Sequence, residues 1–127
     1  MTRMGESEQE FVSHVVELMQ SLGPVRARRM FGGHGIFLDD LMFGLVADSV
    51  LYLKTDARTR DEFMTRGLEA FAYTRQGKVL KMSYHQAPEE ALEDRGAMQA
   101  WSGMAYRAAL RAATGKSGKH KGRRRAE

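Results

Sequence analysis

The residues of this chain that could perform acid–base or metal chemistry are few and scattered. Its four histidines are His14, His34, His85 and His120. No two of them form an H-x-x-x-H pair, and no carboxylate stands at ligand spacing beside one on a predicted helix, so the pattern predicts no metal site. The chain has no cysteine, which excludes thiolate ligands, disulfides and a cysteine nucleophile.

Serine and carboxylate catalysis find equally little support in the sequence. Ser83 lacks the helix that follows the nucleophile of a nucleophile elbow. The acidic run Glu89, Glu90, Glu93 and Asp94 occupies predicted helix starts, where capping and the helix dipole account for carboxylates. We therefore predict no catalytic residues, no metal, no cofactor and no enzymatic activity.

A glycine cluster at Gly32, Gly33 and Gly35 is the most distinctive motif. Glycine is favoured where the backbone needs a positive φ or where another chain passes close. Gly33 and Gly35 open a G-x-G-x-x-G pattern, but Leu38 stands in place of its third glycine and no helix is predicted to follow. Dinucleotide binding in this form is therefore excluded.

We interpret the cluster as a structural motif, a bend between paired strands, whose members are Met30, Phe31, Gly32, Gly33 and Gly35. The less favoured alternative is a small enzyme or ligand binder at this junction. It would use His34 and His85, which lie on different strand regions but could meet in space, together with Tyr84.

The hydrophobic pattern predicts the elements that must position these residues. Helices are expected at about 7–22, 56–66, 89–93 and 95–113, and strands at 25–30, 35–39, 41–48, 50–54, 71–74 and 78–85. The order α-β-β-β-β-α-β-β-α predicts an α+β, two-layer domain with a largely antiparallel sheet covered by helices on one face. Met30, Met42, Met82 and Met98 fall at predicted core positions, where they would act as filler.

Positive charge is concentrated at the C-terminal end of the sequence. Residues 115–127 carry a net charge of +5, which leaves residues 1–114 at −1. We expect a folded domain over 1–114 and a disordered basic tail over 115–127, because the tail has almost no apolar side chain to bury. The candidate nucleic-acid contacts are Lys116, Lys119, Lys121, Arg123, Arg124 and Arg125.

Several short motifs, taken in order, resemble the TfoX N-terminal domain family, the module of bacterial Sxy/TfoX regulators of natural competence. The resemblance rests on residues 29–37, 42–48, 51–54, 71–73, 81–84 and 88–90, followed by Trp101. It implies an α+β domain that is often a homodimer, has no catalytic site and acts with a transcription-regulatory protein.

We therefore predict a non-enzymatic regulatory and protein-interaction module, with non-specific nucleic-acid association through the basic tail as the alternative. No apolar run approaches the length of about 20 residues needed to span a bilayer. The polar, acidic start of the chain does not match a signal peptide. A cytoplasmic location without membrane contact is expected.

Overall fold

The structure is a computed structural model that describes residues 4–30 and 32–124. In chain order its elements are α1 (Met4–Leu18), the 3-10 helix η1 (Gln20–Leu22), β1 (Arg26–Met30), β2 (Gly33–Leu38), β3 (Leu41–Ala47), β4 (Val50–Lys54), α2 (Arg60–Thr65), β5 (Ala70–Arg75), β6 (Lys78–Gln86), α3 (Glu89–Glu93) and α4 (Arg95–Arg124). The predicted α+β class and order of elements are confirmed, with α3 and α4 as the expected short and long helices.

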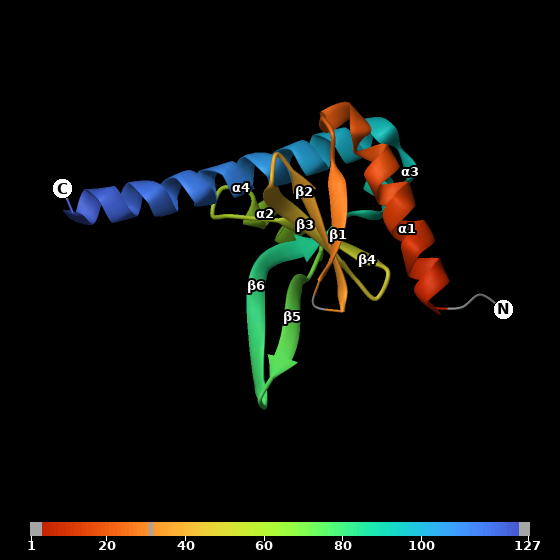
Figure 1. Ribbon diagram of the computed structural model, residues 1–127, viewed down its shortest axis with the longest axis horizontal. Helices are drawn as coiled ribbons and strands as arrows, with labels where there is room; N and C mark the ends of the chain where they lie inside the picture. The colour runs from red at the N-terminus through yellow and green to blue at the C-terminus, as the bar shows by residue number, and fades with distance from the viewer. Residues whose placement is uncertain (1–3, 31, 125–127) are drawn as a thin grey trace.

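The strands form one six-stranded antiparallel sheet with the spatial order β1-β2-β3-β4-β6-β5 (Figure 1). Three tight turns connect neighbouring strands, at Asp39-Asp40, Asp48-Ser49 and Gln76-Gly77. Both residues of each turn have a positive φ, between 53° and 80°. Such turns match the right-handed twist of the strands that they join, and Asp, Asn and Gly are the residues that tolerate them best.

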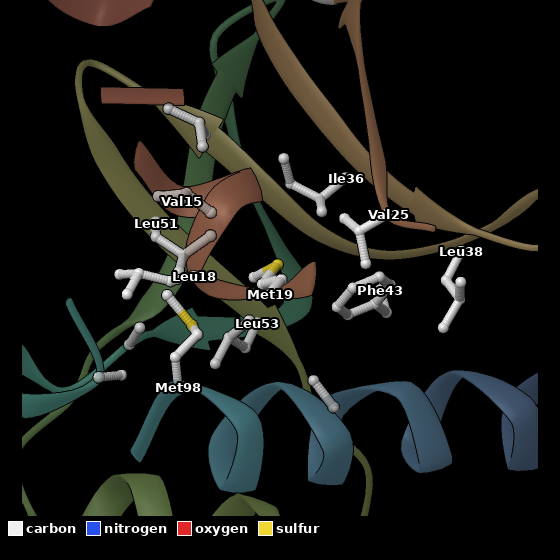
Figure 2. Packing of buried hydrophobic residues seen from close by; sticks show 14 of the residues in the cluster. Val15, Leu18, Met19, Val25, Ile36, Leu38, Phe43, Leu51, Leu53 and Met98 are labelled. Atoms are coloured by element: carbon white, nitrogen blue, oxygen red, sulfur yellow. The ribbon is translucent and has the colours of Figure 1, made fainter. Parts of the chain in front are cut away.

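The hydrophobic core lies between one face of the sheet and the helices. Val15 of α1, Met19 directly after α1, and Met98 of α4 are fully buried against Leu51 and Leu53 of β4. Figure 2 shows these side chains meeting between the strands and the two helices. The helix α4 crosses the sheet over β3 and β4, so the alternating apolar positions of these strands fix which face the helices cover.

Helix α4 is longer than the sequence predicts. It begins after Asp94, whose Oδ2 accepts a hydrogen bond of 2.7 Å from the backbone N–H of Ala97. It then continues to Arg124, whereas the sequence predicts a helix end at 113 and a disordered tail from 115. Extending an existing helix requires no new nucleation, and basic residues are favourable near its C-terminal end. The boundary between a folded domain over 1–114 and a basic tail over 115–127 stays a prediction.

The described residues contain no helix with the length and apolar character that a bilayer-spanning segment requires.

Candidate functional site

The face of the sheet opposite the helices is the most prominent candidate surface. Side chains on this face are large and aromatic: Tyr52 of β4 meets Phe71 of β5 edge to face, with ring centroids 4.9 Å apart. Basic side chains lie over other rings, with the Arg28 guanidinium 5.0 Å from the centroid of Phe37. We call this surface the helix-free face, because the described helices all pack on the other side of the sheet through the core.

The glycine motif lies at the hairpin of β1 and β2. Gly32 has a φ of +76° in the connection, and Gly33 is the first residue of β2. A Cβ at Gly33 would stand 2.2 Å from the backbone oxygen of Val46 on β3, so the close approach of the two strands requires glycine. The sheet register shifts just beyond the motif, between Ile36 and Phe37. Phe31 lies outside the described residues.

Gly35 permits a different close approach. A Cβ at this position would stand 2.5 Å from Sδ of Met30, 2.8 Å from Cε1 of Phe37 and 3.2 Å from Sδ of Met42. These three side chains therefore pack directly over Gly35 on the helix-free face. The motif shapes this face as well as the strand junction.

An apolar cavity of about 360 Å³ opens beside the motif. It lies between β2 and β3 on one side and the hairpin of β5 and β6 on the other. Its lining residues are Met30, Gly33, His34, Met42, Leu45, Val46, Ala47, Phe71, Tyr73, Thr74, Arg75 and Met82. Of the four methionines expected in the core, Met98 alone is part of the core cluster; the other three line this cavity. For them the core interpretation is wrong, because alternation in the strands places them on the second face.

The aromatic wall of the cavity is built by strand β5. Its register against β6 shifts between Ala70 and Ala72, at Phe71. The rings of Phe71 and Tyr73 are stacked with centroids 6.0 Å apart, and Tyr73 is 39% exposed. Sequence reasoning did not identify these residues or Arg75 as site residues. The local sequence identifies only a hairpin and cannot show what the hairpin faces.

The residues of the enzyme alternative are held by separate structural partners. Nδ1 of His34 lies 3.2 Å from Glu8 of α1, whereas Nδ1 of His85 lies 3.0 Å from the Oγ1 of Thr55 in the core. Burial, followed by the charge of Arg60, lowers the pKa of His85, which favours its neutral form. The two histidines therefore act in different hydrogen-bonded pairs.

Tyr84 is the third residue of that alternative, and it lies on the helix-free face, opposite to His85. Its hydroxyl donates to the backbone oxygen of Met42 at 3.5 Å, and burial raises its pKa to about 12. A phenol held protonated in this way supports the strand pairing rather than proton transfer at neutral pH. Among the described residues, no group of three or more histidine and carboxylate side chains could hold a metal ion.

The hairpin of β5 and β6 projects away from the rest of the sheet (Figure 1). Strand β4 pairs with only the last part of β6, at Tyr84, His85 and Gln86, and the N–H of Thr55 then donates to the oxygen of Ser83. The first part of β6, Lys78–Met82, therefore has β5 as its single strand neighbour in the described part of the chain. Val79 on this segment is 67% exposed.

The basic residues predicted to contact nucleic acid lie far along α4. The structure places Lys116, Lys119, Lys121, Arg123 and Arg124 on the C-terminal part of the helix, which extends away from the sheet in Figure 1. Arg125 lies outside the described residues.

Comparison with known proteins covers the region that contains the glycine motif, the cavity and the hairpin. A family model described as TfoX N-terminal domain matches residues 17–109. The chain is also 31% identical over 86 residues to DNA transformation protein TfoX1 of Aliivibrio fischeri (strain ATCC 700601 / ES114). That alignment covers 68% of this chain but 39% of the relative, so the match spans about two fifths of the relative's length. The basic end of α4 lies beyond the residues that the family model matches.

Proposed function

We propose that this chain, which belongs to the TfoX N-terminal domain family, is a cytoplasmic regulatory module that acts through protein contacts and not by catalysis. The name of its relative, a DNA transformation protein, supports a role in the control of DNA uptake. The separate partners of His34, His85 and Tyr84 support a non-catalytic role. In this proposal the module contacts a second copy of itself and a transcription-regulatory protein.

The projecting hairpin is the observation that carries the proposal of self-association. An isolated two-stranded ribbon is marginally stable in water, whereas a sheet of three or more strands is stable. The backbone of Ser83 faces β4, because its oxygen accepts from Thr55. Alternation along β6 then turns the backbone groups of Lys81 and Val79 toward the same open edge.

The open edge of β6 has a register in which two copies of the chain fit. Antiparallel pairing about a two-fold axis at Leu80 places Val79 of one copy opposite Lys81 of the other. Both are residues whose N–H and C=O face outward, as a hydrogen-bonded pair requires. No two like charges stand opposite each other in this register. Two hairpins joined in this way form a four-stranded sheet.

The test is the dimerisation constant of the full chain, measured by analytical ultracentrifugation over a range of concentrations. Val79→Lys would place two lysines opposite each other at both symmetric pairs, and we expect it to weaken the dimer roughly tenfold. Val79→Glu would place a carboxylate opposite Lys81, and the dimer should persist. Thr74→Lys is the matched control, since it adds the same charge to the same hairpin, on β5.

Two outcomes would contradict this arrangement. One is a wild-type chain that stays monomeric at every concentration. The other is equal weakening of the dimer by Val79→Lys and Val79→Glu. That result would show that residue 79 of one copy does not lie opposite Lys81 of the other.

A second candidate function is non-specific nucleic-acid association through the basic end of α4. Its support is the concentration of positive charge on a helix that extends away from the sheet (Figure 1). Such binding would rest on phosphate contacts and counterion release, so it would depend steeply on salt and little on base sequence.

A further inference from the structure

We propose that the cavity on the helix-free face is a binding site for an amphipathic carboxylate, a small molecule with an apolar chain and one carboxylate group. The proposal is independent of dimerisation through the β6 edge. It would make this regulatory module responsive to a metabolite.

The interior of the cavity suits an apolar chain. Its lining includes Leu45, 8% exposed, and its wall includes the stacked rings of Phe71 and Tyr73. A volume of about 360 Å³ is within the range of small-molecule sites, which are mainly apolar with a few polar groups at defined places.

Three methionines make the cavity adaptable. Met30, Met42 and Met82 line it, and a thioether side chain without branches can follow ligands of different shape. The sulfur atoms of Met30 and Met42 lie close to Gly35, in space that a side chain on residue 35 would need. The glycine of the motif therefore keeps room for the methionines beside the cavity.

Arg75 is the one arginine or lysine among the lining residues in the described part of the chain. Arg75 lines the cavity and is exposed, and it makes no ion pair among the described residues. No lining residue is acidic. A guanidinium binds a carboxylate through two parallel hydrogen bonds, which gives both affinity and orientation. The site thus combines an apolar chamber with one anion-binding group.

The first experiment is isothermal titration calorimetry of the full chain with hexanoate, octanoate and decanoate. Each additional methylene that enters the cavity should strengthen binding about fourfold. Decanol serves as the neutral probe and should bind at least tenfold more weakly than decanoate. Affinity that does not change with chain length, or equal affinity for decanol and decanoate, would overturn the proposal.

Variants locate the binding within the molecule. Arg75→Gln should weaken decanoate binding at least tenfold and leave decanol unaffected. Lys78→Gln is the matched control, because Lys78 pairs with Arg75 in the strand register, is also exposed and does not line the cavity. Ala47→Phe should fill the cavity and abolish binding of decanoate, with thermal unfolding used to verify that the variant folds.

An equal loss of decanoate binding in Arg75→Gln and Lys78→Gln would mean that the overall charge of the hairpin, and not a contact with Arg75, determines binding. That result would contradict the proposed site. If no carboxylate binds and Ala47→Phe instead weakens self-association, the cavity belongs to a protein interface and the ligand proposal is wrong. A monomeric chain that binds decanoate would contradict the dimer and leave this site in place.

Discussion

At the scale of single residues, Gly33 and Gly35 are both restricted to glycine, but by different neighbours. At Gly33 the obstacle is the backbone oxygen of Val46, which cannot move without breaking the pairing of β2 and β3. At Gly35 the nearest atoms belong to side chains, and the sulfur of Met30 can shift. The cost of adding a methyl group should therefore differ between the two positions.

We expect Gly33→Ala to lower the free energy of unfolding by about 3 kcal/mol and Gly35→Ala by about 1 kcal/mol, the upper and lower ends of the usual cost of overpacking. Urea denaturation followed by circular dichroism measures both. Equal effects of the two substitutions would contradict the distinction between backbone and side-chain obstacles.

The ion pair of Asp56 and Arg111 is a second residue-scale feature. Nε and Nη2 of Arg111 donate to the two carboxylate oxygens at 2.6 and 3.1 Å, which ties α4 to the segment after β4. The hydrogen bond from Arg111 is the main cause that lowers the pKa of Asp56 below its ordinary 3.8. Helix α2 begins four residues later, at Arg60, so the carboxylate of Asp56 lies before the helix, where it holds Arg111.

A carboxylate with a lowered pKa stabilises the fold above its unfolded-state pKa, and this contribution is lost as the pH falls through the folded-state pKa. Asp56→Asn should therefore lower stability at pH 7, with a difference from wild type that shrinks below about pH 4. Arg26→Gln is the control: it removes a pair with Asp40 whose side chains are 63% and 89% exposed, and should have little effect. Chemical denaturation between pH 7 and pH 3 gives both results. A difference for Asp56→Asn that stays constant over this range would contradict the linkage.

At the scale of elements, α4 combines a core helix with glycine residues that weaken it. Gly103 is buried in the helix, and a Cβ there would stand 3.5 Å from Nη1 of Arg107 and 3.7 Å from Cδ1 of Leu22. Both are ordinary contact distances. The position therefore has room for alanine, which has the higher helix propensity.

Gly103→Ala should raise the free energy of unfolding by up to about 1 kcal/mol. Gly115→Ala, in the part of α4 where a Cβ would meet nothing within 4 Å, should leave global unfolding unchanged, because the end of a helix can fray independently. Thermal and urea unfolding test the pair. Destabilisation by Gly103→Ala would show that the contact with Leu22 is tighter than the distances indicate.

At the scale of the whole molecule, the positive charge lies in one region, and the sheet with its cavity and hairpin lies in another. The part of the chain before residue 115 is nearly neutral and contains the sheet, the cavity and the hairpin, whereas the end of α4 is strongly basic. We therefore expect nucleic-acid binding to depend on the basic residues at the end of α4 alone.

Replacing Lys119 and Lys121 by glutamine should reduce the slope of log K against log salt by roughly 1.8 for duplex DNA, about 0.9 for each phosphate that the lysines no longer neutralise. Replacing Arg58 and Arg60, two exposed basic residues just before and at the start of α2, should leave the slope unchanged. Fluorescence anisotropy across a salt series measures both variants. Equal slopes for wild type and the Lys119/Lys121 variant would contradict binding through this segment.

The sequence by itself determined the elements, their order and the family. Local signals sufficed there, because helix and strand periodicity, the turn pairs such as Asp39-Asp40 and the glycine motif all act over a few residues. The cap at Asp94 was also predictable, since capping depends on the residues immediately following.

The tertiary structure alone decided which distant residues meet. Arg111 reaches Asp56 across 55 positions, and the β5 and β6 hairpin closes a cavity against β2 and β3. The bulges beside Phe37 and Phe71 shift the pairing register, so a period of two could not assign every side chain to a face. Contacts of this kind depend on how a twisted sheet brings its strands together, and no local pattern in the chain records that geometry.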